Sequence, residues 1–288
     1  FPTSYANTSL RIPPISCHLQ PPNTESSPAP WLEASAAISA TLWDIPNTMS
    51  IIDEKLAKEF LVNPDDVDLS EATEITDGAA EALSKHEGYL ALSGLTELSG
   101  AAAESLSRHE ENLSLGLKEL SDAAAEALSK HEGAALWFNR LTELSDAAAE
   151  SLSKHQGDLW LWGLKELSGA AAESLSKCKG DLFLRGLTEL SDAAAESLSK
   201  HKGEWLSLGG LTELSDAAAE SLSKIRGELH LNSLTELSDA AAESLSSHQG
   251  NLVLGGLTQL SDAAMESLSK HQGQINRMDP KEWVESLV

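Results

Sequence analysis

The sequence predicts a solenoid built from repeated strand–helix units, and three observations predict it. A core related to Leu-Thr-Glu-Leu recurs between residues 67 and 273, in nine copies with a usual period of 23. The front half of each copy alternates apolar and polar residues, and the back half has helical spacing. A fixed period of this length is typical of solenoids, because one unit is too small to bury its own apolar face and must stack on its neighbours.

The copies are aligned by the first residue of this core. Counted from Leu95, the spacings are 22, 24, 23, 23, 24, 23 and 23. Before each core, two leucines such as Leu182 and Leu184 alternate with other residues, which predicts a strand with one buried face. The core column is Ala72, Leu95, Leu117, Leu141, Leu164, Leu187, Leu211, Leu234 and Leu257.

A short helix is predicted after each core, for example from Ser191 to Gly203. Ser or Thr fills the first position in all nine copies and is the expected N-cap. The next residue is Asp in seven copies, where it favours the helix N-terminus, and Gly100 or Gly169 in the other two. Lys and Gly near the end of this stretch suit a helix C-terminus. Ala194, Leu198 and His201 would form the buried stripe.

The copy Val67-Asp-Leu-Ser-Glu-Ala-Thr-Glu-Ile-Thr-Asp-Gly-Ala-Ala-Glu-Ala-Leu83 resembles a leucine-rich repeat, most closely the cysteine-containing subtype in a short, 23-residue bacterial-type variant. The resemblance covers roughly 70% of the chain. It implies an α/β, right-handed solenoid with a parallel β-sheet on the concave face and short α-helices on the convex face. It also implies protein binding as the usual role. The chain departs from the family where Leu replaces the Asn or Cys of the turn, and where His mostly replaces the second Cys.

Flanking segments differ from the repeats. Residues 1–48 hold eight of the ten prolines and little charge, which predicts a disordered tail. Met49 is the first methionine, so one interpretation is that the tail lies upstream of the true start. Residues 49–66 have the pattern of an N-terminal capping helix, and residues 274–288 that of a C-terminal cap helix beginning near Pro280. The last three residues also have the form of a peptide bound by strand addition, against the simpler interpretation of a packed helix end.

Composition narrows the classes of partner. The formal charge of -25 argues against nucleic acid and anionic membranes as partners. Cys17 and Cys178 are too few for a disulfide framework, which favours a reducing, cytoplasmic location. The sequence contains no run of 18 apolar residues, so it predicts no membrane-spanning helix. A monomer is expected.

No constellation of residues predicts catalysis, a metal site or a cofactor. Phosphate-binding loops and the common hydrolase motifs are missing from the sequence. Seven histidines fall in one repeat column, where Cys178 and Ile225 fill the same position in two other copies. A position that accepts Ile is a packing position, so we expect this column to be at least partly buried. The column is His86, His109, His131, His155, His201, His248 and His271.

Candidate binding residues are those that break the repeat beside the strand leucines. Three consecutive strands carry an aromatic residue between their two leucines, and further aromatic and polar residues flank them. Strands lie about 4.8 Å apart, so these side chains would form one patch on the concave face. The predicted partner-binding residues are Tyr89, Trp137, Asn139, Trp160, Trp162, Phe183, Arg185, Trp205 and His230.

This patch supports two functional hypotheses and a structural one. Exposed aromatic patches mark interfaces, which predicts a non-catalytic scaffold that binds another protein. Ring stacking on Trp137, Trp160 and Phe183 would alternatively bind a carbohydrate or small ligand. Cross-strand stacking that only stabilises the sheet is the structural interpretation. Replacing Trp160 and Phe183 by Ser, as found at Ser114 and Ser207 in the same column, is expected to leave the fold intact.

Overall fold

The computed structural model describes residues 51–287, in which strands and helices alternate regularly. The predicted tail at residues 1–48, Met49 and the terminal Val288 lie outside the described residues. None of the helices in the described part is both long enough and apolar enough to cross a membrane.

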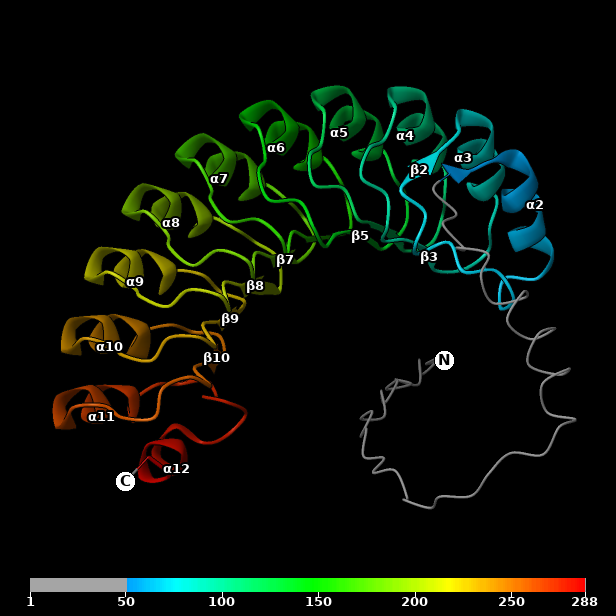
Figure 1. Ribbon diagram of the computed structural model, residues 1–288. Coiled ribbons are helices and arrows are strands. Elements are labelled where there is room, and N and C mark those ends of the chain that lie inside the picture. Colours follow the sequence, from blue (N-terminus) through cyan, green and yellow to red (C-terminus); the bar gives the residue numbers. More distant parts are fainter. Residues whose placement is uncertain (1–50, 288) are drawn as a thin grey trace, which may run out of the picture. The chain divides into compact units, whose positions relative to one another are not determined.

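Each repeat contributes a short helix, and all but the first contribute a strand of two to four residues to the main sheet. Figure 1 shows the helices on the convex side of the array and the strands on its concave side. The strands are β3 (Leu90–Leu92), β4 (Leu113–Leu115), β5 (Ala135–Phe138), β6 (Asp158–Trp160), β7 (Leu182–Phe183), β8 (Trp205–Ser207), β9 (Glu228–His230) and β10 (Leu252–Val253). The helices are α3 (Asp77–Leu83), α4 (Gly100–Leu106), α5 (Asp122–Leu128), α6 (Asp146–Leu152), α7 (Gly169–Leu175), α8 (Asp192–Leu198), α9 (Asp216–Leu222), α10 (Asp239–Ser246) and α11 (Asp262–Leu268).

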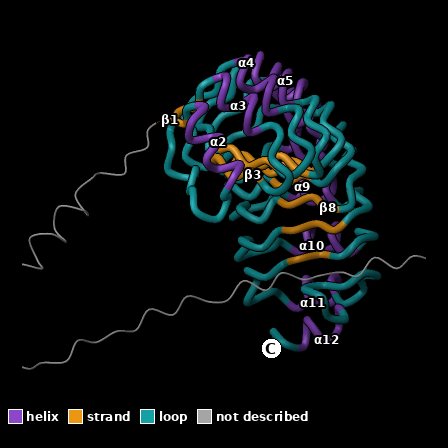
Figure 2. The backbone as a smooth tube through the Cα atoms, turned by 90° about the vertical axis from the view of Figure 1, so that its right-hand side faces the viewer, coloured by secondary structure: helices purple, strands orange, loops and turns teal. Residues whose placement is uncertain are grey.

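The strands form one parallel sheet in the order β3 to β10, so neighbours in sequence are neighbours in space. The register pairs leucine with leucine, as in Leu136 with Leu159 and Leu159 with Leu182. Figure 2 shows successive strands lying side by side along the array. These observations confirm the predicted α/β solenoid with a parallel sheet.

The core lies between the sheet and the helices. Leu182, Leu184 and Leu187 are completely buried, and so are Ala194 and Ala195 on the helix of the same repeat. Alanine has only a methyl side chain, which lets the short helix approach the strands closely. Because each leucine column packs against the same column of the next repeat, burial continues along the whole array.

The helices begin as predicted and end earlier than predicted. In every repeat the Ser or Thr hydroxyl accepts a hydrogen bond from the backbone N–H three residues later, as Ser191 does from Ala194 at 3.2 Å. The helix in that repeat ends at Leu198, with Ser199 as its C-cap. His201 and Gly203 therefore lie in the following turn, and the prediction that Gly ends the helix was wrong.

A second hydrogen bond links successive helix N-termini. Ser145 donates to Asp122 and Ser168 donates to Asp146, each at 2.5 Å across the repeat boundary. The same Ser–Asp bond occurs at Ser99, Ser215, Ser238 and Ser261. We call this series of bonds the N-cap ladder.

Local hydrogen bonds pair the backbone N–H groups in the turn where leucine-rich repeats have Asn or Cys. The backbone N–H of Leu187 donates to the carbonyl of Leu184 at 3.3 Å. Seven of the nine repeats contain the equivalent bond, with N···O distances from 3.1 to 3.4 Å. The turn closes on itself, which explains how Leu can replace a polar side chain at this position.

The first repeat differs from the prediction. Residues 67–69 form no strand, and the carboxylate of Asp68 instead accepts the backbone N–H of Ser70 at 2.8 Å. This local bond competes with extended pairing. Before the capping helix α2 (Glu54–Val62), a strand that we did not predict, β1 (Ile51–Ile52), pairs in parallel with β2 (Glu74–Ile75).

The C-terminal cap is shorter than the predicted segment. Helix α12 spans Pro280–Glu285, with Asp279 as N-cap and Trp283 almost fully buried. Ile275 forms single bridges to Leu252 and Met278 instead of a strand. Asn276 and Arg277 have φ angles of 51° and 66°, so the chain turns sharply after Ile275 and cannot continue as a strand.

Candidate binding surface

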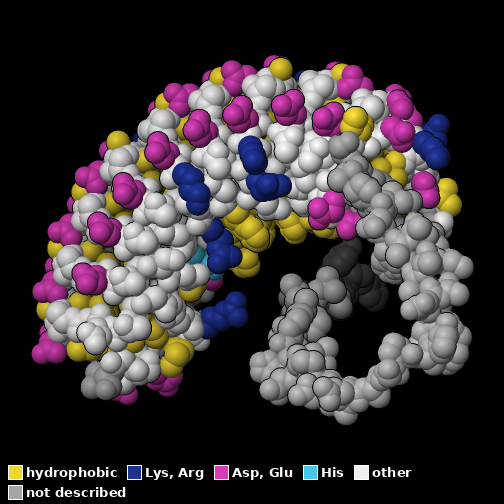
Figure 3. Space-filling model, viewed as in Figure 1, with side chains coloured by type: hydrophobic (Ala, Val, Ile, Leu, Met, Phe, Trp, Pro, Cys, Tyr) yellow, Lys and Arg dark blue, Asp and Glu magenta, His cyan; other side chains and the backbone are white. Residues whose placement is uncertain are grey.

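The sheet register brings the predicted aromatic residues together. Trp137 pairs with Trp160, and Trp160 pairs with Phe183, on neighbouring strands β5, β6 and β7. The residues on either side of them, all leucines except Phe138, are fully buried in the core, so alternation places these rings on the opposite, concave face. Figure 3 shows hydrophobic side chains gathered on the concave side and acidic side chains recurring along the convex side.

The rings form a continuous series, which we call the ring ladder. The centroids of Trp160 and Phe183 lie 3.8 Å apart with an interplanar angle of 18°, so these two rings stack. Trp137 lies 5.2 Å from Trp160 on the other side. Trp205 continues the series, at 6.2 Å from both Phe183 and His230. Offset-stacked and edge-to-face pairs of this kind stabilise the arrangement beyond their area of burial.

A small residue allows the ladder to skip one repeat. The ring of Tyr89 lies 5.2 Å from that of Trp137, although the strand that carries Ser114 runs between them. Ser114 is fully buried and accepts a hydrogen bond from the Nδ2 atom of Asn139 at 3.0 Å. The predicted residues Tyr89, Trp137 and Asn139 therefore lie in one cluster.

Exposure divides the predicted residues into two groups. Tyr89, Trp162 and Trp205 are 47%, 37% and 44% exposed. Phe183 is only 6% exposed because its neighbours in the ladder cover it. Phe183 therefore offers little of its ring to a partner, and its role in binding stays a prediction. The exposed aromatic surface lies on the other three residues.

Two charged contacts border the ladder. The guanidinium of Arg185 lies 5.6 Å from the ring centroid of Trp162, a cation–π arrangement that orders both side chains. The Trp162 ring also packs edge-on against Trp160 at 5.2 Å. On the other side, the Nε2 atom of His230 lies 2.6 Å from a carboxylate oxygen of Glu228.

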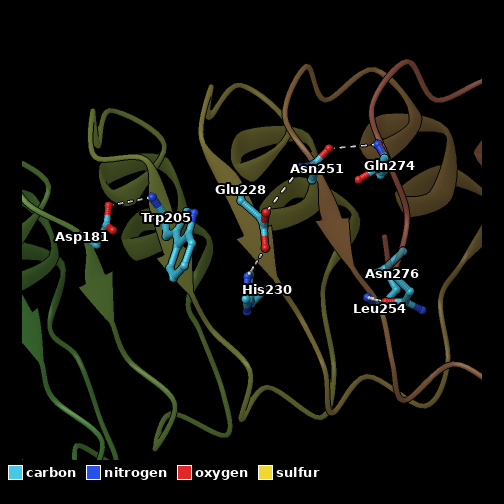
Figure 4. A network of polar contacts seen from close by, with 8 residues as sticks. All are labelled: Asp181, Trp205, Glu228, His230, Asn251, Leu254, Gln274 and Asn276. Atoms are coloured by element: carbon cyan, nitrogen blue, oxygen red, sulfur yellow. Dashed lines mark hydrogen bonds and ion pairs between the residues drawn. The ribbon is translucent and has the colours of Figure 1, made fainter. Parts of the chain in front are cut away.

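A column of polar residues holds the strands beneath the rings, and sequence reasoning missed it. The carboxylate of Asp181 accepts the backbone N–H of Trp205 at 2.8 Å, and Asn251 accepts that of Gln274 at 3.0 Å (Figure 4). Asp158 makes the equivalent bond with the backbone N–H of Asp181 at 2.8 Å. The signal was present in the sequence, because these residues occupy the same repeat position, directly before the first strand leucine, that Trp205 and Glu228 fill in the two repeats between Asp181 and Asn251.

Burial raises the pKa of Asp158, the first acid of this column. The negative charges of Asp181 and Glu204 raise it further, while the hydrogen bond from the Asp181 backbone opposes the shift. Negative charge is therefore crowded along this margin of the concave face.

Several polar atoms within the ladder are unpaired. The indole nitrogens of Trp137 and Trp160 and the Oδ1 atom of Asn139 are buried without a hydrogen-bond partner in the described part of the chain. A buried donor without an acceptor is unfavourable, and native structures usually pair such groups. Because the surrounding side chains cover these atoms, they are a local cost of packing the ring ladder and not contacts open to a partner.

The histidine column lies in the core, away from this surface. His109 and His155 are completely buried, and His131, His201, His248 and His271 are at most 5% exposed. Neighbouring rings lie 5.7 to 6.2 Å apart, as in His86 and His109, which are parallel within 2°. Among residues 51–287, no group of three or more His, Cys, Asp or Glu side chains is arranged to hold a metal ion.

Burial lowers the pKa of six of these histidines: His109, His131, His155, His201, His248 and His271. For His131 burial and the neighbouring imidazoles lower the pKa to about 4. Cys178 fills the same column, and burial raises the pKa of its thiol to about 12, so it is unsuited to act as a nucleophile. The residues of this column therefore pack the core, as the presence of Ile225 at the same repeat position predicted.

No protein-family model matches the chain, and no curated protein matches it. The crystal structure of an internalin, InlF, from Listeria monocytogenes is similar, with a TM-score of 0.43 and 18% sequence identity. The match covers 74% of this chain and 65% of the internalin chain.

The repeating unit itself identifies the architecture. Successive copies place parallel strands in one sheet with leucine paired to leucine, and each copy stacks a short helix on the other side of the core. The cysteine-containing subtype stays a prediction. In its fold, this chain is an α/β solenoid of repeated leucine-containing units with one main parallel sheet.

Proposed function

We propose that the concave aromatic surface binds another protein and that the chain is a non-catalytic interaction module. The observation that carries this proposal is the exposure of Tyr89, Trp162 and Trp205 around a ladder that is itself well packed. Trp, Tyr and Arg dominate the binding energy of protein interfaces, and rigid anchors lose little entropy on binding. Arg185 beside Trp162 adds a donor group for a carboxylate or carbonyl.

The ring arrangement disfavours the alternative of carbohydrate stacking on Trp137, Trp160 and Phe183. The stacked pair of Trp160 and Phe183, 3.8 Å apart, occupies one face of each ring. Trp137 lies between Tyr89 and Trp160, at 5.2 Å from each. A sugar would therefore have to use Trp162 or Trp205, whereas a protein partner can use side chains at several points of the surface.

The test is affinity capture from the organism's own lysate with the full chain and with the variant Trp162→Ala/Trp205→Ala. We expect a protein captured by the unaltered chain to be lost by the variant, because each anchor contributes roughly 2 kcal/mol or more. Val62→Ala is the matched control, since it removes a hydrophobic side chain that is 76% exposed on helix α2, outside the ring ladder.

A glycan array probed with the same proteins separates the two classes of ligand. Glycan binding that requires Trp162 and Trp205, with no captured protein, would replace the proposal by the carbohydrate alternative. Equal capture by the unaltered chain and the double variant would show that the partner binds elsewhere on the array.

A further inference from the structure

The charge of the side chains along one edge of the array changes sign from the first repeats to the later ones. The position that follows the histidine column is acidic in the first three repeats, basic in the fifth to seventh, and Gln in the remaining three. The series is Glu87, Glu110, Glu132, Gln156, Lys179, Lys202, Arg226, Gln249 and Gln272. Because this position lies in the turn after each helix, its side chains lie along one edge of the array.

In the three basic repeats, a second cation precedes the histidine column. Lys177, Lys200 and Lys224 add to Lys179, Lys202 and Arg226, so six exposed cations lie on three consecutive turns of a chain whose formal charge is -25. We call these six residues the basic edge. It contains six of the 20 Lys and Arg residues of the chain.

Two surface cavities join these cations into one surface. The first, of about 490 Å³, is lined by Lys177, Lys179, Lys200 and Lys202, together with the acidic residue Glu173. The second, of about 520 Å³, is lined by Lys200, Lys202, Lys224 and Arg226. Since Lys200 and Lys202 belong to both cavities, the basic edge is continuous over the three repeats.

Little of this positive charge is neutralised. Lys177 pairs with Glu173 and Lys224 pairs with Glu220, each at 3.4 Å and with highly exposed side chains. Exposed pairs of this kind contribute little and are easily exchanged for another anion. Lys200, Lys202 and Arg226 form no ion pair with any other residue between 51 and 287.

The buried column beneath the basic edge also departs from the repeat. Cys178 and Ile225 replace His in two of the three basic repeats and nowhere else in the column. The basic residues at the edge and the replacement of His in the buried column therefore occur in the same repeats. Charges that only solvate the surface would not need to coincide with a change in the core.

We propose that the basic edge binds an acidic peptide segment of a partner protein. Carboxylates are suited to the ammonium and guanidinium groups that line the two cavities. The segment must be short, because Gln156 and Gln249 bound the basic edge and Glu87, Glu110 and Glu132 follow on the same edge. A long polyanion such as nucleic acid would meet these acids, and its bases would find no exposed aromatic ring among the residues that line the cavities.

The experiment measures fluorescence anisotropy of a labelled deca-glutamate peptide titrated with the full chain at low and physiological salt. We expect binding that weakens with salt, since the Debye length falls to about 8 Å at physiological ionic strength. The variant Lys179→Glu/Lys202→Glu/Arg226→Glu should bind about tenfold more weakly or worse. Glu already fills this position in the first three repeats, so the fold should tolerate the change.

The matched control is Lys118→Glu/Arg140→Glu/Lys165→Glu, which reverses three exposed cations elsewhere in the array and changes the net charge equally. It should keep the affinity within about threefold. If the first variant fails to fold, Gln substitutions at Lys179, Lys202 and Arg226, which copy the residue found at Gln156, replace it. Absence of peptide binding at low salt, equal loss in both variants, or tighter binding of a deca-thymidylate would each overturn the proposal.

Discussion

Two columns of rings cross the same repeats, one in the core and one on the concave face. The histidine column repeats in seven of nine copies, and six of its members are buried. The ring ladder does not follow the repeat in residue type, since its central column holds Trp, Phe or His in some copies and Ser in others. Tyr89, Trp162 and Trp205 beside that column are at least 37% exposed. Both are spaced by the stacking of the units, so a column of rings by itself does not indicate function.

Two properties distinguish the two columns of rings: whether their residue types recur from repeat to repeat, and how exposed their side chains are. A residue that recurs at the same buried position satisfies the packing that every unit needs, as Leu182 and His201 do. A residue that breaks the repeat on an exposed face, such as Trp162 or Trp205, is not required by that packing. The predictions below test this distinction at each kind of position.

The largest effect should come from acid titration of the histidine column. Folded-state pKa values are lowered, and the unfolded value is about 6.5. Below that pH the unfolded state binds more protons, so stability is complete above it and falls as the pH drops towards the folded-state values. His131, with a folded-state pKa of about 4, alone should lose about 1 kcal/mol between about pH 6.5 and 5.5. Chemical unfolding over this range measures the combined loss.

The control for this prediction is the variant His131→Ile/His155→Ile, which copies the residue found at Ile225 in the same column. Its unfolding free energy should depend less on pH, because two titrating groups are gone. Asp158 acts in the opposite sense, since its raised pKa makes the folded state bind a proton more readily. An unchanged pH dependence in the variant would mean that the column does not control acid stability.

An intermediate effect should distinguish the buried and exposed members of the ring ladder. Phe183→Ser removes a ring that is 6% exposed and stacked on Trp160, so we expect a loss of about 2 kcal/mol in unfolding free energy. Trp205→Ala removes a ring that is 44% exposed and should lose less than about 1 kcal/mol. Urea unfolding of both variants measures the difference. Equal losses would show that the whole ladder is structural.

The burial of Phe183 also revises an expectation from the sequence. Serine is tolerated at Ser114 and Ser207, which suggested that Phe183 could be replaced without loss. The structure shows that those serines are buried beside rings that cross over or cover them, whereas Phe183 is the centre of a stack. The repeat position of Phe183 alone could not predict its burial, because the exposure of a side chain depends on its rotamer and on neighbouring side chains one and two repeats away.

The repeat made the sheet, the helix starts and the core leucines predictable, because successive copies enforce the same pattern. Features outside the repeat were not predictable in the same way. Strand β1 exists only because Ile51 and Ile52 find a pairing partner in β2, and Asp68 prevents the first strand through a local hydrogen bond. The aromatic residues could be placed on one face from the alternation, yet the covering of Phe183 depended on side-chain packing.

The smallest effect concerns two positions that break the repeat outside any aromatic surface. Gly100 and Gly169 replace the Asp of the N-cap ladder, so Ser121 and Ser191 lack the carboxylate to which other N-cap serines donate. The consequence is visible in the cap itself. Ser121 and Ser191 accept their backbone N–H at 3.2 Å, whereas Ser145 and the other serines of the ladder accept theirs at 2.9 to 3.0 Å.

Restoring Asp at both glycines should therefore raise stability. A Cβ atom at Gly100 or Gly169 would meet no atom within 4 Å, so Asp introduces no clash. Each substitution adds a hydrogen bond to a charged acceptor and favourable charge at a helix N-terminus, together about 0.5–1.5 kcal/mol. The two sites are distant in the array, so the double variant Gly100→Asp/Gly169→Asp should show the sum in thermal unfolding. Asp146→Gly, which removes the partner of Ser168, should lose a similar amount. If that loss appears without the gain, the two glycines do more than interrupt the ladder, and an exposed break in the repeat would mark function on the convex side as well.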